Sequence, residues 1–577
     1  MHTLDWIVML GTLLGIVAYG VYRTRNITSV QSYLLGDRDL PWWTIGLSIM
    51  ATQASAITFL STPGQAYEDG MRFAQFYFGL PVAMVILSIF VLPLYYRLNV
   101  YTAYEYLEGR FDLRTRTLTA ILFLVQRGLA AGITIYAPAI ILSTILGWSL
   151  SVTILFIGVI VIFYTVLGGT KAVSVTQKQQ MIIILSGMFL AAIILLFQLP
   201  ENISFGDAVG IAGKLGKLNV VDFKFDLDSR YNFWSGMLGG TFLFLSYFGT
   251  DQSQVQRYLS GKSLTESRLG LLFNGILKVP MQFLVLFVGI LVFVFFLFNQ
   301  APVHFNESNV AKLQGEKLEQ FADLEVQHTQ LFQERRDEVF RLLDAIHTDN
   351  EAAVSQSQDR IAEMMDQNKN IRLQADELIL EADPDAKIED TDYVFITFVT
   401  RYLPIGMVGL LLAVIFSAAM SSTSSELNAL ATTTVIDLYR RSIVKNRDDR
   451  HYLQASKWFT IMWGCLALFF AATASLFDNL IQAVNIIGSL FYGVILGIFL
   501  VAFFLKWVGG RAVFIGALFA EVIVATVFIL DNMEVIHIAY LWLNLIGCVL
   551  CMLFAMMIQL IWPPKPQMEL DGVLDVE

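Results

Sequence analysis

Long apolar stretches separated by short polar segments recur along most of the chain. A helix needs about 20 apolar residues to cross the hydrocarbon core of a bilayer, and the pattern predicts about thirteen such helices. They are expected at residues 4–22, 41–65, 74–96, 118–146, 148–167, 179–198, 234–256, 270–298, 395–438, 456–475, 480–505, 511–530 and 536–562. The pattern therefore predicts an all-α fold and a polytopic membrane protein.

One region, residues 307–382, departs from this pattern. Glu, Gln, Asp and Ala dominate it, and its apolar residues recur at helical spacing. The run Thr348, Asp349, Asn350 followed by Glu351 is a helix-restart signal, so we expect a helical hairpin with its turn near residues 347–350. The hairpin is interpreted either as a solvated insertion, or as a docking surface for a protein partner or a lid over the outer vestibule.

Composition agrees with a membrane protein, because 56% of the 577 residues are hydrophobic and only 15% are charged. The net charge of -11 arises mostly from residues 301–392, which carry 22 acidic and 9 basic side chains. The rest of the chain is close to neutral. Nothing in this charge distribution indicates binding to nucleic acid.

Lys and Arg are concentrated in alternate short loops. By the positive-inside rule this places the N-terminus outside and the C-terminus in the cytoplasm, with the hairpin projecting outward. Residues 1–22 lack the basic start and the small-residue cleavage site of a signal peptide, so we expect a retained first span. These features favour an integral membrane protein, and together with the family resemblance given below they favour a bacterial inner membrane.

The chemistry of an enzyme is missing from the sequence. Cys465, Cys548 and Cys551 fall within predicted spans without other metal-ligating residues at suitable spacing, so free thiols and no metal cluster are expected. No phosphate-binding GxxxxGK[ST] motif or activated nucleophile is present. The candidates for function are therefore the polar residues inside the apolar spans.

The most informative of these residues form an unbroken hydroxyl run, Ser421–Ser425, in the middle of the apolar segment from Leu412 to Arg441. A membrane helix satisfies its own backbone, so five adjacent hydroxyls at mid-membrane depth are useful only if they face protein, water or an ion. The alternative is a small, polar face that packs against another helix.

Two predicted spans carry signals of a break. The second contains Ser55, Thr58, Ser61 and Thr62 among apolar residues and is expected to end at Pro63-Gly64. The seventh is interrupted by Gly249–Gln252. Two interrupted helices in corresponding positions of two halves indicate a transporter site near the membrane midplane.

Together with GGTKAVSVTQKQQ (Gly168–Gln180) and AAMSSTSSELNALAT (Ala418–Thr432), these segments resemble the sodium:solute symporter family, which includes the sodium/glucose cotransporters and has the LeuT fold. The resemblance covers nearly the whole chain outside residues 301–392. It implies two inverted five-helix repeats, formed by spans two to six and seven to eleven.

The resemblance also implies a division of the chain into six segments. These are a peripheral first span with its inner loop (1–40), the first repeat and the start of the second (41–300), the outward-facing acidic hairpin insertion (301–392), the rest of the second repeat (393–508), two peripheral spans (509–562) and a cytoplasmic tail (563–577).

A sodium site follows from the same resemblance. Carried over residue by residue, its ligands are the carbonyls of Ala51, Ala54 and Ala418 and the hydroxyls of Ser421 and Ser422. Sodium ions prefer oxygen ligands, and an unwound helix frees backbone carbonyls that can supply them. Na+ bound here is expected to hold the second span against the ninth.

One departure from the family pattern concerns the number of sodium ions. The family's fourth motif usually has Asp after Thr, whereas this chain has Gln177 after Thr176. A neutral amide favours a single sodium ion. Thr176, Gln177 and Ser425 are then expected to line a sodium exit path.

The solute site is expected between the broken helices and the third, fourth and eighth spans. Thr58 and Tyr77 stand where the sugar-carrying branch has Gln and Glu, which weakens the case for a sugar site. Ser55 and Thr58 are more similar to the corresponding positions of carriers of sialic acid, monocarboxylates, vitamins and iodide.

Arg127 lies about ten residues into the fourth span, and an arginine at that depth is costly unless it is paired or hydrated. It is interpreted either as a bidentate clamp for a solute carboxylate, or as a structural residue that pairs with Asp251 or helix-end carbonyls or extends to the inner membrane interface. Asp251 and Gln252, at the second break, are expected to bind solute hydroxyls, or Asp251 to cap a helix.

Three functions are compatible with these features. The first is sodium-coupled symport by alternating access of a small polar organic solute, with a carboxylate of the sialic-acid or monocarboxylate type. The second is sodium-coupled symport of a sugar or polyol. The third, from another class, is a transporter-derived solute sensor that signals through the acidic hairpin or the short tail, residues 563–577. The tail argues against it because it is too small for a signalling domain.

Overall fold

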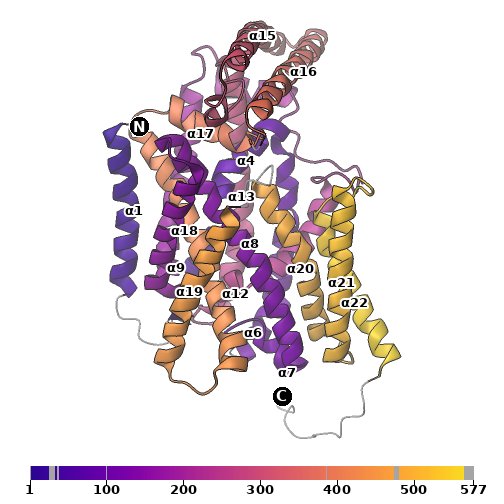
Figure 1. Ribbon diagram of the computed structural model, residues 1–577. Coiled ribbons are helices and arrows are strands. Elements are labelled where there is room, and N and C mark those ends of the chain that lie inside the picture. The colour runs from indigo at the N-terminus through magenta and orange to yellow at the C-terminus, as the bar shows by residue number, and fades with distance from the viewer. Residues whose placement is uncertain are drawn as a thin grey trace.

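The computed structural model describes residues 2–24, 33–34, 38–98, 100–384, 386–472 and 480–563. Within these ranges the chain is built from helices, as predicted, and they run side by side as one elongated bundle (Figure 1). α1 lies at one edge of the bundle, and α21 and α22 lie at the opposite edge (Figure 1).

The first half of the bundle extends to α13. Its elements are α1 (Thr3–Thr24), α3 (Trp42–Gln53), α4 (Ala56–Asp69), η2 (Gly70–Tyr77), α5 (Gly79–Ile86), η3 (Leu87–Val91), α6 (Leu92–Leu98), α7 (Glu105–Arg110), α8 (Leu113–Leu146), α9 (Leu150–Phe197), α10 (Phe205–Lys214), η4 (Ser235–Gly239), α11 (Gly240–Gly249), α12 (Gln252–Leu259) and α13 (Leu264–Phe298).

The second half begins with the hairpin. Its elements are α14 (Glu307–Val310), α15 (Glu316–His347), α16 (Glu351–Ala382), α17 (Thr391–Tyr402), α18 (Met407–Thr433), η5 (Thr434–Ile443), α19 (Asp449–Ala471), α20 (Leu480–Phe504), α21 (Gly510–Asn532) and α22 (Leu541–Ile561).

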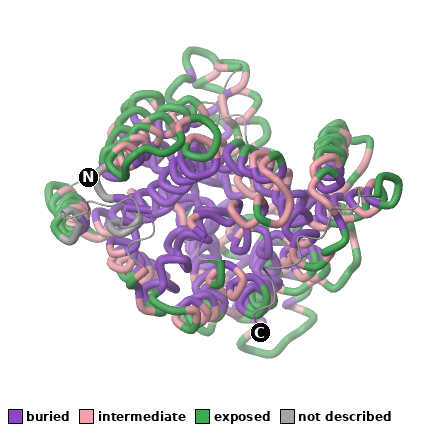
Figure 2. Tube along the Cα trace, turned by 90° about the horizontal axis from the view of Figure 1, so that it is seen from below, coloured by how far each residue is buried: buried purple, intermediate pink, exposed green. Residues whose placement is uncertain are grey.

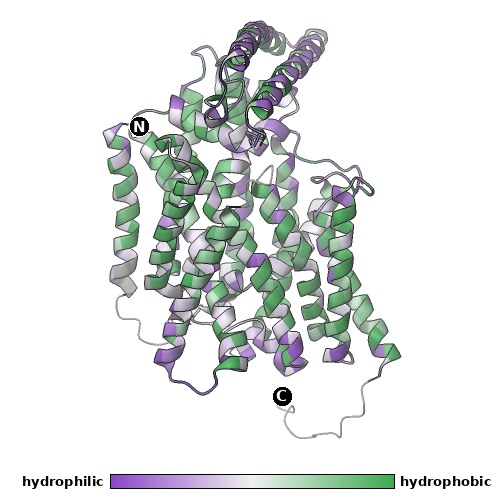
Figure 3. Ribbon diagram, viewed as in Figure 1, coloured by the Kyte–Doolittle hydropathy of each residue, from purple (hydrophilic) through white to green (hydrophobic). Residues whose placement is uncertain are grey.

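By length and hydropathy, nine helical segments in the described ranges could cross a membrane, and residues 150–166 form a shorter apolar helix. Figure 3 shows hydrophobic residues throughout the body of the bundle and hydrophilic ones along α15 and α16. The integral membrane character is therefore supported, and the count of thirteen spans stays a prediction.

The second predicted span breaks between α3 and α4. Ala54 ends α3 with a non-helical ψ of 82°, and Ser55 precedes α4 in an extended conformation. Pro63 and Gly64, where the sequence analysis ended the span, lie inside α4. That boundary was wrong because a proline is tolerated in a membrane helix when neighbouring groups satisfy the freed carbonyl.

The seventh predicted span breaks where expected. α11 ends at Gly249, Thr250 is non-helical, and Asp251 is the extended N-cap of α12. Its carboxylate accepts a hydrogen bond of 2.9 Å from the backbone N–H of Ser253. Because α12 begins with this bond to a side chain, its first turn is stabilised without support from α11.

The predicted continuous span at residues 395–438 is wrong. The structure divides it into α17 and α18, which are separated by Pro404 and Gly406. Pro404 keeps Leu403 in the extended region, at a ψ of 145°, and Gly406 has a φ of +89°, which favours glycine. The functional helix is therefore α18, which starts at Met407.

The predicted hairpin is present as α15 and α16, which pack against each other and project from one end of the bundle (Figure 1). The turn lies at residues 348–350, and the Asn350 side chain caps α16 by accepting from the Ala353 N–H at 3.2 Å. α1 begins near the hairpin end of the bundle, and α22 ends at the far end (Figure 1).

α18 belongs to the most deeply buried of the nine candidate membrane-spanning segments in the described ranges. It packs against α1, α3, α4, α8, α9 and α19. Seen along the bundle, buried residues fill the middle and exposed residues lie at the periphery (Figure 2). Ser421–Ser425 are all at most 1% exposed, so this run of hydroxyls faces the protein interior.

Candidate functional site

The Ser421 and Ser422 hydroxyls lie against the carbonyls that the sequence analysis assigned to sodium. The Ser421 hydroxyl donates to the Ala51 carbonyl of α3 at 2.8 Å. The Ser422 hydroxyl donates to the Ala418 carbonyl of its own helix at 2.9 Å. Ala54, at the end of α3, is fully buried like Ala51 and Ala418.

The break in α3 explains why Ala51 can bind a ligand. In a continuous helix the N–H of Ser55 would bond the Ala51 carbonyl, but here it donates to Gln53 at 3.1 Å. The Ala51 carbonyl is therefore outside the helical ladder and accepts from Ser421 instead. Carbonyl and hydroxyl oxygens of this kind are hard ligands that suit a sodium ion.

Gln177 of α9 connects three helices beside this site. Its amide nitrogen donates to the Thr52 hydroxyl at 3.0 Å and to the Ser425 hydroxyl at 2.8 Å, and its amide oxygen accepts from Ser48. The two hydroxyls also lie 3.1 Å from each other. A neutral amide thus fills the polar space between α3, α9 and α18.

Thr176 does not share this environment, although the sequence analysis grouped it with Gln177 and Ser425. Its hydroxyl contacts the hydroxyl of Tyr164 and donates to the Val173 carbonyl at 3.1 Å. Its methyl group lies beside Gly20 of α1. The structure therefore brings two of the three proposed exit-path residues together and turns the third toward α1.

A cavity of about 70 Å³, measured as the space open to the centre of a water molecule, lies beside the break between α3 and α4. Its walls come from the α3–α4 break, η2, α8, α11, α18 and α20. It is lined by Thr52, Gln53, Ser55, Ile57, Thr58, Phe76, Tyr77, Arg127, Thr134, Leu243, Phe244, Tyr247, Glu426, Ile481, Val484, Asn485 and Tyr492. Four of the predicted solute residues, Ser55, Thr58, Tyr77 and Arg127, are among them.

Gln252 is not among the lining residues, and its side chain is engaged elsewhere. Its amide oxygen accepts from the Ala103 N–H at 3.2 Å, and its amide nitrogen donates to the Tyr101 carbonyl at 2.9 Å. These bonds fix the start of α12 to the segment that precedes α7. The expectation that Gln252 binds solute hydroxyls therefore has no geometric support.

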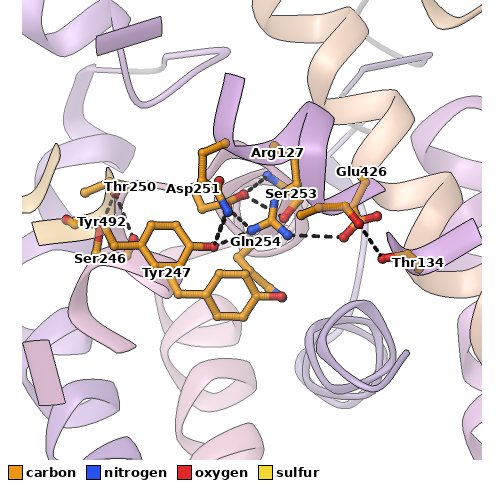
Figure 4. A network of polar contacts seen from close by, with 12 residues as sticks. Arg127, Thr134, Ser246, Tyr247, Thr250, Asp251, Ser253, Gln254, Glu426 and Tyr492 are labelled. Atoms are coloured by element: carbon orange, nitrogen blue, oxygen red, sulfur yellow. Dashed lines mark hydrogen bonds and ion pairs between the residues drawn. The ribbon is translucent and has the colours of Figure 1, made fainter. Parts of the chain in front are cut away.

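Arg127 is the centre of a buried ionic network (Figure 4). One guanidinium nitrogen pairs with Asp251 and contacts the Tyr492 hydroxyl, and the other lies 3.1 Å from Glu426. The guanidinium also lies over the ring of Tyr247, 5.3 Å from its centroid. The structural pairing with Asp251 is confirmed, and the role of Arg127 as a clamp for a solute carboxylate stays a prediction, although the residue lines the cavity.

Asp251 acts within this network as a structural residue. One carboxylate oxygen accepts from the N–H and hydroxyl of Ser253, at 2.9 and 2.7 Å. The other accepts from Arg127 and, at 3.1 Å, from the Tyr492 hydroxyl. Buried charges persist when they are paired and hydrogen-bonded in this way.

Sequence reasoning missed Glu426, which is the second acidic partner of Arg127. Its signal was present, because it is an ionisable residue directly after the hydroxyl run in an apolar helix. Tyr492 and Asn485 were missed as well. They lie in α20, whose apolar composition offers no comparable signal.

A family model, the sodium:solute symporter family, matches residues 33–318 and 379–523. The gap between the two matched ranges falls within the hairpin. The comparison thus separates a transporter body from an insertion, at nearly the boundaries that composition predicted.

Three similar proteins are sodium-coupled cotransporters from human and mouse. The chain is 34% identical to the human sodium/iodide cotransporter over 270 residues, which span 46% of this chain and 41% of that protein. It is 26% identical to the mouse sodium-coupled monocarboxylate transporter 2 over 512 residues, 88% of this chain and 69% of the relative. It is 28% identical to the mouse sodium-coupled monocarboxylate transporter 1 over 498 residues, which span 86% of this chain and 68% of that protein.

Among solved structures, a Na+-coupled sialic acid symporter in its substrate-bound, outward-open state superposes with a TM-score of 0.74. The match covers 98% of this chain and 99% of that one, at 20% sequence identity. This likeness establishes the fold, which is the LeuT fold that the resemblance to the sodium:solute symporter family implied.

Proposed function

The chain belongs to the sodium:solute symporter family, and we propose that it imports a small polar organic solute bearing a carboxylate, driven by the inward sodium gradient. It carries the solute by alternating access and works as a transporter, not as an enzyme. Na+ is the coupling ion, and the two ligands bind at adjacent sites near the middle of the bundle.

The observation that carries this proposal is the position of both sites on one interrupted helix. Ser421 meets Ala51 on the α3 side of the break. Ser55 and Thr58, on the α4 side, line the cavity. Sodium bound between α3 and α18 stabilises the arrangement that shapes the cavity, and by reciprocity bound solute raises the affinity for sodium.

We assign the sodium ion to Ala51, Ala54, Ala418, Ser421 and Ser422. We assign one ion per cycle, because the amide of Gln177 occupies the neighbouring polar space between Thr52 and Ser425 without adding negative charge. An ion that leaves toward the inner side passes this amide.

Arg127 supports a carboxylate-bearing solute, because its planar guanidinium lines the cavity and its Nε has no hydrogen-bond partner among the described residues. Relatives that carry monocarboxylates and a structural neighbour that carries sialic acid agree with this class. Ser55 and Thr58 add hydroxyls that can bond the body of the solute.

A sugar or polyol is the second candidate. The observation in its favour is the combination of neutral amides and aromatic rings in the lining, since Gln53 and Asn485 line the same cavity as Phe76 and Tyr77. A solute sensor is the third candidate. The tail that would signal, residues 564–577, lies outside the described residues.

We further propose a bacterial inner membrane location, with the N-terminus and the hairpin outside. In Figure 1 α1 begins at the hairpin end of the bundle, in agreement with this orientation. The hairpin packs on the bundle through ion pairs such as Arg372 with Asp390. It serves as a fixed insertion over the outer ends of α4, α13 and α17, and as the surface available to a protein partner.

The experiment is a thermal-unfolding titration of the purified protein with a panel of carboxylic acids and sugars, each measured in sodium and in choline. Stabilisation by an acid only in sodium is the expected result. Radiolabelled uptake of that acid into proteoliposomes, with and without a sodium gradient, then separates a transporter from a sensor. If only sugars stabilise the protein, the solute is a sugar or polyol, which is the second candidate. If sodium has no effect with any ligand, the proposal is overturned.

A further inference from the structure

Glu426 places a carboxylate in the wall of the cavity. Its side chain is 7% exposed and belongs to α18, four residues beyond Ser422. One of its oxygens lies 3.1 Å from an Arg127 nitrogen. The other, Oε2, is buried, and the hydroxyl of Thr134 also hydrogen-bonds the carboxylate (Figure 4). An ionised carboxylate has about four acceptor sites, so Glu426 can accept further hydrogen bonds from a group in the cavity.

The charges around Arg127 do not balance. Asp251 uses both oxygens within the protein, on Ser253 and on Arg127 with Tyr492, so it is the structural counter-ion of the arginine. The charge of Glu426 is then in excess. With both acids ionised, the network carries one net negative charge at the wall of the cavity.

No second cation compensates this charge from within the described lining, where Arg127 is the sole basic residue. Lys278 of α13 is close by, with its ammonium 5.8 Å from the ring centroid of Tyr77, but it is not a lining residue. An isolated buried charge is costly, so the excess charge of Glu426 favours a positively charged group in the cavity itself.

The walls of the cavity are suited to such a group. Phe76 and Tyr77 have ring centroids 4.9 Å apart, Tyr77 and Phe244 are 5.9 Å apart, and Tyr247 and Tyr492 are 5.9 Å apart. The faces of aromatic rings attract ammonium groups, and more strongly where water is excluded. All five rings belong to the lining.

Two further polar side chains line the same space. The amide oxygen of Gln53 is an acceptor without a partner among the described residues, whereas the amide of Asn485 is bonded to the Tyr540 hydroxyl. With Arg127 Nε as a donor and the Glu426 carboxylate as an acceptor, the lining offers both kinds of atom. A solute that accepts hydrogen bonds through one group and donates them through another fits this lining.

We propose that the solute is a zwitterion whose ammonium group binds Glu426 against the aromatic walls while its carboxylate faces Arg127. The ammonium group supplies donors to the carboxylate of Glu426 and cancels the excess charge. This inference rests on the proposed function and narrows its substrate class from carboxylates in general to amino acids and related zwitterions.

The test uses matched solutes in which the carbon next to the carboxylate bears a hydrogen, a hydroxyl or an ammonium group. Alanine, lactate and propionate form one set, and leucine, 2-hydroxyisocaproate and 4-methylvalerate form a larger one. Their binding is measured by thermal unfolding in sodium, on the unmodified protein and on Glu426→Gln. Sodium titration without solute reports whether each variant folds and keeps the ion site.

An amino acid is expected to bind the unmodified protein at least about tenfold more tightly than its hydroxyl and hydrogen analogues, and Glu426→Gln is expected to remove that preference. Glu521→Gln is the matched control, because Glu521 of the peripheral helix α21 is likewise a carboxylate with a buried oxygen. It is expected to keep the preference.

Equal binding of the three analogues, or an unchanged preference in Glu426→Gln, overturns the zwitterion proposal and leaves sodium-coupled acid transport intact. Sodium-dependent binding of sugars in place of acids overturns both. If Glu426→Gln does not respond to sodium, Glu426→Asp provides the readout. It retains the charge and is expected to retain the preference for the amino acid, and a loss of preference there also overturns the proposal.

Discussion

The hydroxyl of Ser421 donates a 2.8 Å hydrogen bond to the carbonyl of Ala51, and this contact joins the middle of α18 to the last turn of α3. The two residues are 370 positions apart in the chain. Because α3 unwinds two residues after Thr52, the carbonyl is outside the helical ladder and can bind a hydroxyl or an ion. An ion here acts on both helices at once.

Replacing Ser421 by Ala is expected to weaken sodium binding at least about tenfold, a loss of about 1.4 kcal/mol, because one ligand and the link to Ala51 disappear together. The measurement is thermal stabilisation as a function of sodium concentration. Ser417→Ala is the control. Ser417 lies one turn earlier on α18, is equally buried, and its hydroxyl has no partner in the described ranges. Equal sodium responses of the two variants would remove Ser421 from the site.

Gln177→Asp is expected to change the number of sodium ions. It places a carboxylate where an amide now contacts Thr52 and Ser425, and these oxygens then form a second ion site. The Hill coefficient of sodium-dependent uptake should rise from about 1 toward about 2. Gln177→Asn, which keeps the neutral amide, should leave it at about 1. A coefficient near 2 in the unmodified protein would contradict the assignment of a single ion.

Arg127→Lys is expected to reduce the affinity for an acidic solute by about tenfold or more. The ammonium group of lysine lacks the planar set of donors with which Arg127 can pair with protein carboxylates and also bind the carboxylate of the solute. Arg116→Lys is the matched control. Arg116 also lies on α8 and pairs with two carboxylates, Glu108 and Asp437, each at 2.7 Å, but it does not line the cavity. Titration of solute in sodium distinguishes them, and an equal loss in both variants would assign Arg127 a purely structural role.

The hairpin is expected to depend on one buried ion pair. Arg372→Ala leaves Asp390, whose side chain is 3% exposed, without its guanidinium partner, and should destabilise the protein by about 3–5 kcal/mol. Lys312→Ala breaks the exposed pair with Asp383 and should change stability by only about 0–1 kcal/mol. Thermal unfolding of both variants at one sodium concentration is the measurement. Similar shifts would show that the hairpin is held by its apolar contacts instead.

Glu389, outside the spans, predicts a pH dependence. Burial, with Glu68 and Asp390 nearby, raises its pKa from 4.5 to about 7. Between these values the folded protein retains a proton that the unfolded chain releases, so this group's contribution to stability falls as pH rises from about 4.5 to about 7. Glu389→Gln should therefore become progressively more stable than the unmodified protein across this window, as measured by unfolding temperature.

The control for this experiment is Glu381→Gln, at the end of α16, where the carboxylate is 65% exposed. Its unfolding temperature should follow that of the unmodified protein at every pH. A constant difference between Glu389→Gln and the unmodified protein from pH 4.5 to 8 would contradict the prediction.

Much of the fold could be predicted from local composition. The apolar spans, the hairpin turn at residues 348–350 and the break at Thr250–Asp251 each depend on the residues of one segment. The division of residues 395–438 was missed because its signals, Pro404 and Gly406, lie within an apolar run whose hydropathy dominated the interpretation. At Pro63 the error was the reverse: the proline was taken as the end of the helix, but a proline does not by itself stop a membrane helix.

The sequence by itself determined that this chain lies in a membrane, that two of its helices are interrupted and that α18 carries hydroxyls to the site. These are properties of single segments, because transfer into lipid and backbone hydrogen bonding are settled within a helix. Only the tertiary structure decided that Arg127 lies between Asp251 and Glu426, 124 and 299 residues away in the chain. Such pairing depends on which faces of packed helices meet, and no local pattern contains that information.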